Sequence, residues 1–453
     1  MSFELHAVEI PEFGLPDEPP AVPASTHEAR CERAYKAANC DWLVVYGDRE
    51  HFANMMFLCG FEPRFEEALL LLGPRNQRIL LVGLECLNYA GIATLPGLEI
   101  VHCPSFSLMG IDRSGPTLPD LLRAVGIHGP LQVGLIGWKY FEPREWPDSN
   151  PGFFAPAFLV DAIRGLIAGS GRLVDATPVL MHPAAGIRAA VDADQIALAE
   201  WGAARGSAAM WRVVSNLREG DSELLAASRM GYAGEPMNAH VMVSSAGAGF
   251  PVRGLRSPAA RLFRKGDSGV AATSYWGGLS ARAGLVDTTN EAFLTAACCY
   301  MEAILEWYSV ADIGVSGGQV FGNVSAILAR NGLRSALNPG HISGHDEWMH
   351  TPMRQDSTDA IASGSLFQVD ISPAPLPDGW ALACIDSVAF ADAALREDLR
   401  QRHPDAFRRM QMRRTFIRDA IGLDLKESIL PLSSVPLCFP PFWLTSNQLL
   451  TVR

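Results

Sequence analysis

The residues best suited to acid–base chemistry gather in one short segment, residues 340–350, with the sequence GHISGHDEWMH. The segment holds three of the eleven histidines of the chain, together with an aspartate and a glutamate. An imidazole has an unperturbed pKa of about 6.5, so it can accept or donate a proton near pH 7. Gly340 and Gly344 allow a close backbone approach, which is typical of a site-lining loop. The segment therefore predicts a catalytic or binding loop.

Further candidate residues lie in two strand-like stretches downstream, residues 365–371 and 380–390. Asp370 could orient a neighbouring imidazole, or accept hydrogen bonds from a cationic nitrogen of a substrate. For Asp386 we expect a turn cap or a structural pairing instead. Cys384 lies close by, but most buried thiols are unreactive, so a cysteine nucleophile is disfavoured.

Other classes of function find little support in the sequence. It contains no Gly-x-Ser-x-Gly elbow, Walker loop or Gly-x-Gly-x-x-Gly fingerprint, and its nine cysteines show no CxxC spacing. With 37 Lys and Arg against 49 Asp and Glu, the net charge of -12 would repel nucleic acid and anionic lipid. The apolar runs fall short of the ~20 residues that cross a bilayer, and no leader is visible. We expect a cytoplasmic protein that acts on a small molecule, without nucleic-acid or membrane partners.

The elements that must position these residues fall into two groups. In the first half, short apolar runs bounded by Gly, Pro and Asn alternate with stretches of helical periodicity, which is typical of an α/β domain. The predicted strands are residues 42–46, 68–72, 79–82, 98–102 and 131–136, and the predicted helices are 119–125 and 158–167.

The pattern of apolar residues changes after residue 182. From 192 to 217 these residues fall on one helical face. Asp221 is expected to cap a second helix. Helices are also predicted at 290–309 and 319–329, and strands at 365–371 and 380–390, so helices and strands are clustered in α+β order. We expect domains at 1–185 and 186–453. The second ends in a Pro-rich extended segment, 429–444, which either closes a cavity or, as we favour, packs along the sheet.

The order of several short motifs resembles the creatinase/prolidase/methionine aminopeptidase superfamily. These are the Gly-His-x-x-Gly turn at 340–344, His350 followed by Pro352, the LFQVD stretch at 366–370 and the IDS stretch at 385–387. Upstream, LREG at 217–220 and RLFRKGD at 261–267 match helix-linker and strand-entry segments of that superfamily. Residues 46–72 are similar to the N-terminal domain of its creatinase and prolidase branch. The resemblance implies an α/β N-terminal domain followed by an α+β pita-bread C-terminal domain over nearly the whole chain.

The resemblance also implies a two-metal centre held by two Asp, one His and two Glu, and here the chain departs. The first Asp position carries Ala272, the second falls within 279–283, where no acidic residue occurs, and the last Glu position carries Ile385. Only His341 and Asp370 remain as potential ligands. Two such ligands cannot hold two ions ~3.5 to 4 Å apart that share oxygens. We therefore expect no metal and no other cofactor.

Creatinase shows that this fold can work without metal, so the resemblance favours a metal-independent hydrolase. It would cleave a C–N bond in a small carboxylate-bearing amidino, guanidino or amide substrate. The proton-shuttling His of creatinase falls at Leu255, so the base must lie elsewhere. The catalytic residues are predicted to be His341, His350 and Asp370.

Substrate-binding residues are predicted in both halves of the chain. In the second half they are His345, Glu347 and Trp348. The creatinase branch forms homodimers in which an N-domain loop enters the partner's cavity, which implies a homodimer here with Phe61 and Arg64 in that role.

Three alternatives remain open from the sequence. A metal-dependent Xaa-Pro-type peptidase or prolidase could recruit ligands from the His cluster, Asp370 and Asp386. A non-catalytic pita-bread binding module would keep the cavity without the chemistry. A lyase would use the same base to abstract a proton next to a carboxylate.

Overall fold

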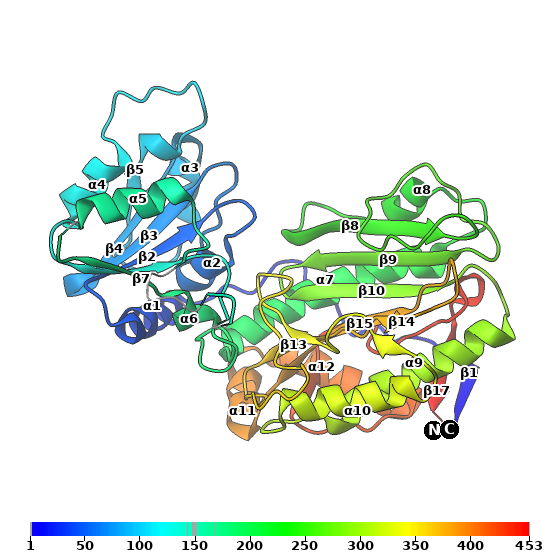
Figure 1. The fold of residues 1–453 in the computed structure, drawn as a ribbon. Helices are drawn as coiled ribbons and strands as arrows, with labels where there is room; N and C mark the ends of the chain where they lie inside the picture. Colours follow the sequence, from blue (N-terminus) through cyan, green and yellow to red (C-terminus); the bar gives the residue numbers. More distant parts are fainter. Residues whose placement is uncertain (1, 143, 147–151, 168, 453) are drawn as a thin grey trace. The chain divides into compact units, whose positions relative to one another are not determined.

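The computed structural model describes residues 2–142, 144–146, 152–167 and 169–452. The chain forms two compact units (Figure 1), one of them Val22–Ala189 and the other the chain up to Ala21 together with Ala190 onward. We call them the N-terminal unit and the C-terminal unit. The start of the chain joins the second because β1 (Phe3–Ala7) pairs with β17 (Gln448–Val452). The predicted division at 185/186 instead assigned these first residues to the N-terminal domain.

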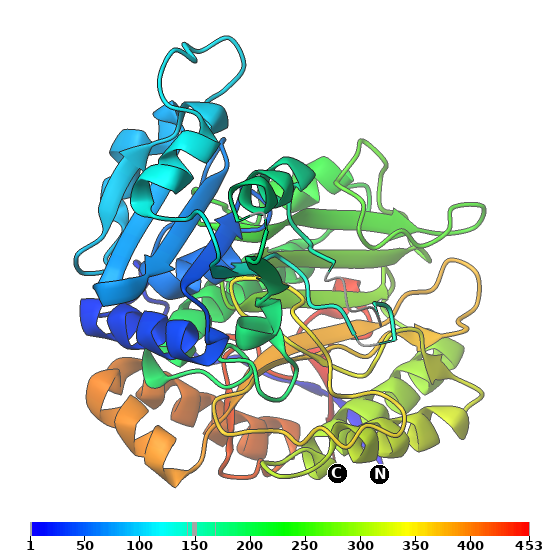
Figure 2. The same ribbon diagram turned by 60° about the vertical axis from the view of Figure 1, so that its left-hand side comes forward.

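The N-terminal unit is built on a six-stranded mixed sheet of order β5-β4-β3-β2-β6-β7. The five strands predicted from the sequence all form, as β2 (Trp42–Gly47), β3 (Ala68–Gly73), β4 (Gln77–Val82), β5 (Glu99–His102) and β6 (Gln132–Ile136). The sixth is β7 (Arg172–Asp175), which pairs parallel to β6. The helices of this unit (Figure 2) are α1 (Ala24–Ala38), α2 (Ala53–Cys59), α3 (Leu84–Tyr89), α4 (Leu118–Val125), α5 (Ala157–Leu166) and α6 (Thr177–Met181).

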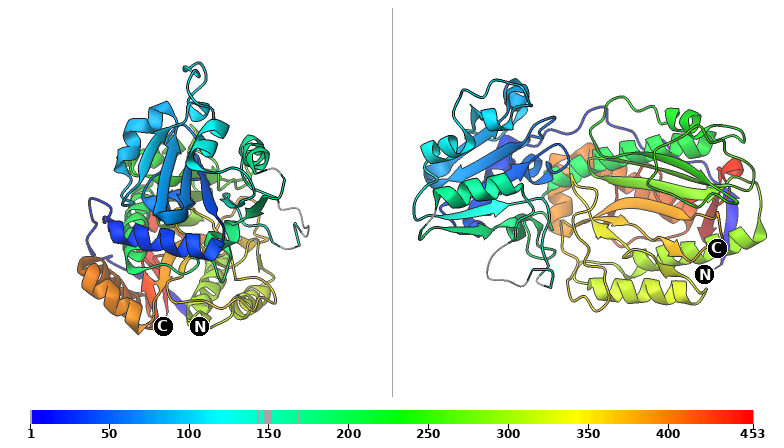
Figure 3. Two further views of the ribbon diagram at one scale, coloured as in Figure 1. Left: turned by 90° about the vertical axis from the view of Figure 1, so that its left-hand side faces the viewer. Right: turned by 45° about the horizontal axis from the view of Figure 1, so that its top comes forward.

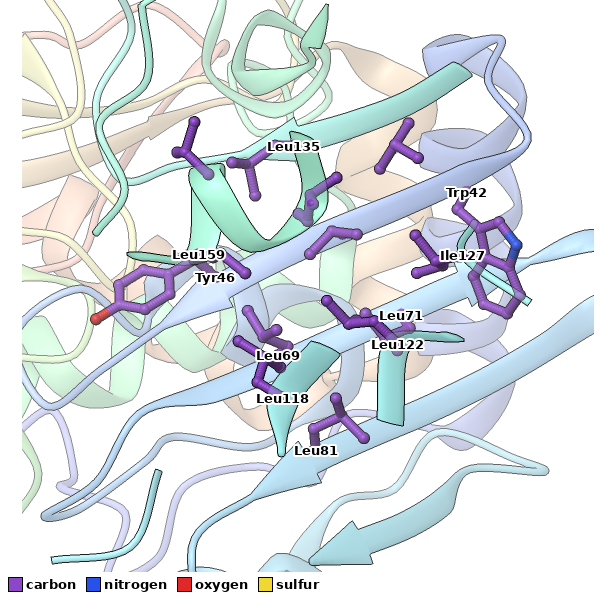
Figure 4. Packing of buried hydrophobic residues seen from close by; sticks show 14 of the residues in the cluster. Trp42, Tyr46, Leu69, Leu71, Leu81, Leu118, Leu122, Ile127, Leu135 and Leu159 are labelled. Carbon is purple, nitrogen blue, oxygen red and sulfur yellow. The ribbon is translucent and has the colours of Figure 1, made fainter. Parts of the chain in front are cut away.

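The core of this unit follows from the two-residue period of its strands. Leu69 and Leu71 point to the same face of β3 and pack against Leu118 and Leu122 of α4, as Figure 4 shows. Thr117 caps α4 in a capping box with Asp120, which fixes where the helix begins.

The C-terminal unit is built on an antiparallel sheet of order β12-β13-β15-β10-β9-β8, with β16 paired to β15. Its strands are β8 (Met237–Ala246), β9 (Ser268–Tyr275), β10 (Gly278–Leu285), β12 (His341–Ile342), β13 (Leu366–Val369), β15 (Ala383–Phe390) and β16 (Ile429–Pro431). A separate small ladder pairs β11 (Arg334–Ser335) with β14 (Pro373–Ala374). The helices are α7 (Ala193–Asn216), α8 (Glu223–Ser228), α9 (Glu291–Val310), α10 (Gly317–Ala329), α11 (Ala393–Arg402) and α12 (Pro404–Phe416).

Helix α7 packs against β9 and β10, and Figure 3 shows the helix and the strands as adjoining layers. The contact requires glycine. A Cβ at Gly202 of α7 would lie 1.4 Å from the carbonyl oxygen of Trp276, in the turn between the two strands. Glycine therefore lets this hairpin rest on the helix, which holds the two strands that carry much of the cavity wall described below.

Two sequence predictions for this unit meet different outcomes. The prediction that Asp221 caps α8 is wrong. Ser222 is the N-cap and accepts from the Leu225 amide at 3.1 Å, while Asp221 pairs with Arg229. The Pro-rich segment packs along the sheet as favoured, because β16 pairs with β15. None of the helices in the described part of the chain has the length and apolar character that a membrane crossing requires.

Candidate active site

A cavity of about 890 Å³ lies within the C-terminal unit, against strands β8, β9, β10 and β15. Alternate residues of a strand share one face of a sheet. Accordingly, β9 contributes Val270 and Ala272 to the wall, and β10 contributes Leu279, Ala281 and Ala283. The wall that β9 and β10 present is hydrocarbon.

The three metal-ligand positions that lack a carboxylate come together in this wall. Ala272 lies directly opposite Ala281 in the pairing of β9 with β10. Ala281 in turn lies opposite Ile385 of β15. With Met242 of β8, these residues form one buried hydrophobic cluster. The strand register thus places apolar side chains side by side where the resemblance implies ligating oxygens.

The residues present do not fit a two-metal centre. Divalent ions of this kind need several anionic oxygens or imidazoles to replace their water. Within the described residues, no group of three or more His, Cys, Asp or Glu side chains is placed to hold a metal ion. His341 and Asp370 are what remains of the implied ligand set.

Two carboxyl groups, Asp370 and Glu347, line the cavity, and the charge of Asp370 acts on Glu347. Asp370 is buried at the end of β13, where burial raises its pKa to about 6, and the Ser372 hydroxyl donates to it at 3.4 Å. Burial, together with the charges of Asp370 and Asp346, raises the pKa of Glu347 to about 7. Neighbouring carboxyls in an apolar site favour sharing a proton over holding two charges. The pair can therefore hold one proton and accept another near neutral pH.

His341 lies beside this pair, on β12. Its Nε2 is 3.5 Å from Oε1 of Glu347, and its Nδ1 is 3.5 Å from the Ile342 carbonyl oxygen. The ring is fully buried, and burial lowers its pKa to about 4, so the imidazole is neutral at pH 7. Trp348 stacks on the ring at 4.0 Å between centroids with 20° between planes. This stacking fixes the imidazole with one nitrogen toward Glu347.

The structure brings together four of the residues predicted from the sequence: His341, Glu347, Trp348 and Asp370. Two other predicted histidines do not line the cavity. His345 is buried with its ring edge-on to Trp276 at 5.4 Å, and the backbone of His350 pairs with Ile342. Their predicted roles in catalysis and binding stay predictions.

Phe61 and Arg64 belong to the N-terminal unit. Phe61 is fully buried, with its ring 5.9 Å from that of Tyr89. The half-exposed Arg64 side chain lies 2.8 Å from the Glu62 carboxylate and donates to the Tyr89 hydroxyl at 3.0 Å. The predicted role of both residues in a partner's site stays a prediction.

The sequence prediction missed two sets of residues. His240 of β8 lines the cavity, and its Nε2 lies 2.9 Å from the carbonyl oxygen of Leu255, the position at which the creatinase base was expected. It lies outside the His cluster, where the pairing of β8 with β9 is irregular between Ala239 and Met242, so the sequence held no signal for it. Gln368 and Ser387, paired across β13 and β15, carry buried polar atoms with no hydrogen-bond partner among the described residues. Gln368 lies two residues before Asp370, and Ser387 lies two residues after Ile385. Residues two apart share one face of a strand, so this spacing was the available signal in the sequence.

A buried ion pair supports the two strands that carry the wall. The Arg282 guanidinium of β10 donates to both carboxylate oxygens of Asp386 of β15 at 3.0 Å, and both side chains are fully buried. The carbonyl oxygens of Val435 and Cys438 accept from the same guanidinium. The structural pairing predicted for Asp386 is thus present, and it fixes β10, β15 and the C-terminal segment together.

Solved structures share this fold. A prolidase from Thermococcus sibiricus is 16% identical with a TM-score of 0.64, covering 82% of this chain and 96% of that chain. An Xaa-Pro dipeptidase from Bacillus anthracis is 13% identical with a TM-score of 0.61, covering 82% and 96%. An X-Pro aminopeptidase from Thermotoga maritima is 14% identical with a TM-score of 0.60, covering 80% and 95%. No family model matches the sequence, and no curated protein matches it.

The comparison confirms the fold predicted from the sequence, an α/β domain followed by a pita-bread domain. The predicted resemblance to the creatinase/prolidase/methionine aminopeptidase superfamily is likewise confirmed at the level of fold. At these identities it says nothing further about chemistry, which depends on the residues of the site.

Proposed function

We propose that this protein is a metal-independent hydrolase that cleaves a carbon–nitrogen bond. The observation that carries the proposal is the carboxyl pair Glu347 and Asp370, which lines the cavity. The apolar wall of this cavity contains Ala272, Ala281 and Ile385, at three of the implied metal-ligand positions. In such surroundings the pair supplies both an acid and a base near neutral pH.

The proposed mechanism gives the two carboxyls different roles. Asp370, with the lower pKa, is ionised and accepts a proton from water as the water oxygen attacks the carbon. Glu347, protonated at the start, donates its proton to the leaving nitrogen as the C–N bond breaks. Transfer of the proton from Asp370 to Glu347 then restores the starting state.

His341 acts in this mechanism as a positioning residue. Donation from Nδ1 to the Ile342 carbonyl would leave a lone pair on Nε2, facing Glu347 at 3.5 Å. A neutral imidazole there keeps the Glu347 carboxyl oriented and protonated. This assignment differs from the sequence-based expectation, in which one imidazole assists the attacking water and the resulting imidazolium protonates the leaving nitrogen.

Substitution of Asp370 tests the proposal. We expect Asp370→Asn to lower kcat by 100-fold or more on the amide or amidine that the protein hydrolyses, because a general base contributes about 10²–10⁴-fold. A matched control is Glu397→Gln, which removes an exposed carboxylate of α11. Full turnover by a folded Asp370→Asn protein would contradict the assignment.

A metal-dependent Xaa-Pro-type peptidase is the second candidate, because the solved structures of this fold include a protein named prolidase and one named Xaa-Pro dipeptidase. Turnover of Xaa-Pro dipeptides that is lost in chelator and restored by a divalent cation would favour it. Its weakness is the wall, in which Ala272, Ala281 and Ile385 offer no ligand.

The quaternary and cellular context is proposed from the sequence resemblance. We propose a cytoplasmic homodimer in which the N-terminal unit of each copy completes the other copy's site through Arg64. Such a guanidinium would grip a carboxylate at the outer end of a bound substrate.

A further inference from the structure

The charge pattern of the cavity indicates which end of a substrate enters it. The ionisable residues that line it are Glu347, Asp370, Asp378 and His240, and none of the described lining residues is Lys or Arg. A carboxylate inside this space would meet other carboxyls and no fixed cation. A nitrogen group with N–H donors would meet acceptors. The inner end of the ligand is therefore a nitrogen group.

The size and floor of the cavity indicate the rest of the ligand. Alanines at alternate strand positions, Ala272, Ala281, Ala283 and Ala383, leave open space above the sheet. The volume of about 890 Å³ lies in the range of about 300–1,000 Å³ that holds drug-sized ligands, and it exceeds what a few heavy atoms fill.

Large apolar side chains gather where the cavity meets solvent. Among the lining residues, Leu255 is 79% exposed, Leu337 49%, Val252 39% and Trp348 39%. Water-exposed hydrocarbon of this extent around a cavity is typical of a binding site, because an apolar ligand removes it from water. The walls and the mouth of the cavity are thus both apolar.

We propose that the cavity binds a substrate with an extended alkyl or aryl body that ends in an amide or amidine nitrogen group directed at Glu347 and Asp370. This inference rests on the proposed function, and it replaces the small polar ligand expected from the sequence with an amphipathic one. A carboxylate on the substrate would lie outside the cavity.

A ligand series tests this inference without requiring turnover. Acetamidine, hexanamidine and decanamidine are titrated at pH 7.5 while the tryptophan fluorescence of the protein, to which Trp348 and Trp380 of the cavity lining contribute, is followed. We expect affinity to rise about fourfold per methylene until the cavity is filled, because each buried CH₂ contributes about 0.8 kcal/mol. Each carboxylate should bind at least tenfold more weakly than the amidine of the same chain length, and guanidinoacetate at least tenfold more weakly than hexanamidine. Affinity independent of chain length, or tightest binding of guanidinoacetate, would overturn the inference.

A cavity-filling variant locates the site. Ala281→Leu should weaken decanamidine at least tenfold, because the added side chain occupies the space above the sheet. Ala394→Leu makes the same change at an exposed position of α11 and should leave the affinity unchanged. If Ala281→Leu fails to fold, Leu279→Ala replaces it. The affinity of this variant for the longest amidine should differ from that of the unsubstituted protein, whereas the affinity of Ala394→Leu should not. Equal affinities in folded cavity and control variants would place the ligand elsewhere and reject the inference.

The two proposals fail in different ways. Binding that depends on chain length, without hydrolysis of the corresponding N-substituted amides, would support the amphipathic ligand and reject the proposed hydrolase function. Hydrolysis of small polar amides, with no binding of the longer amidines, would support the hydrolase function and reject the amphipathic ligand.

Discussion

At the scale of single residues, the site depends on the burial of ionisable groups. The motif order in the sequence predicted that His341, Glu347, Trp348 and Asp370 share a site, because the turn and the strand end follow one another in the chain. It could not predict that the charge of Asp370 raises the pKa of Glu347, since that depends on how the loop folds back over the end of β13. His240 lies far upstream on β8, and the fold of the sheet brings it to the cavity.

The buried carboxyls predict a dependence of stability on pH. The pKa of Glu347 is raised from 4.5 to about 7, so its contribution is fully present below pH 4.5 and is lost as the pH rises through 7, where a charge must form in the cavity. Glu347→Gln removes this loss. We expect the free energy of unfolding of the variant, relative to the unsubstituted protein, to be roughly 1–2 kcal/mol higher at pH 8 than at pH 5.

Urea unfolding of both proteins at the two pH values measures this difference. His341, whose pKa is lowered to about 4, contributes the opposite dependence, present above pH 6.5 and lost as the pH falls through 4. That contribution is common to both proteins and cancels in the comparison. A variant whose relative stability is the same at pH 5 and pH 8 would show that Glu347 is not buried as described.

At the scale of elements, the periodicity of apolar residues predicted β2 to β6, β13, β15 and the long helices α7, α9 and α10, but not α1 or the wall strands β8, β9 and β10. It missed α11 and α12, whose sequences are rich in charge. The face of α12 that packs inward carries Arg409 and Arg413, and both pair with the buried Glu200 of α7, at 2.5 and 2.7 Å. An inward face made of arginines interrupts the apolar repeat, so the helix cannot be recognised until its partner is known.

The ion pair between β10 and β15 predicts a large loss of stability on substitution. Asp386→Ala leaves the fully buried Arg282 without its carboxylate. Breaking a buried pair from one side costs about 3–5 kcal/mol, so we expect a fall of that size in the free energy of unfolding, measured by denaturant titration. The exposed pair of Glu397 and Arg400 on α11 is the control, and Glu397→Gln should leave the unfolding curve unchanged. Equal stability of the two variants would show that the buried pair does not hold the strands.

At the scale of the whole molecule, sequence motifs predicted the fold because their order follows the order of the strands. They predicted the loss of ligands position by position, but not its result, a continuous apolar wall with room for a ligand. That wall arises from the register of three strands, which brings Ala272, Ala281 and Ile385 together from distant parts of the chain.

The proposed dimer predicts complementation between inactive copies. Arg64→Ala and Asp370→Asn should each be nearly inactive as pure proteins if Arg64 acts in the partner's site. Mixing them under exchange conditions should restore about a quarter of the sites, because half of the dimers are mixed and each of these has one intact site. The readout is turnover after mixing, with each variant alone as control. Mixtures no more active than their components would reject action in the partner's site.

The central claim is that the carboxyl pair performs the chemistry without a binuclear metal centre. Elemental analysis of the active protein, combined with its turnover of an amide or amidine in excess chelator, tests it most directly. We predict well under 0.1 equivalent of Mn, Fe, Co and Zn per chain, with turnover unchanged by the chelator. Two equivalents of metal per chain, with turnover abolished on their removal and restored on their return, would contradict the account.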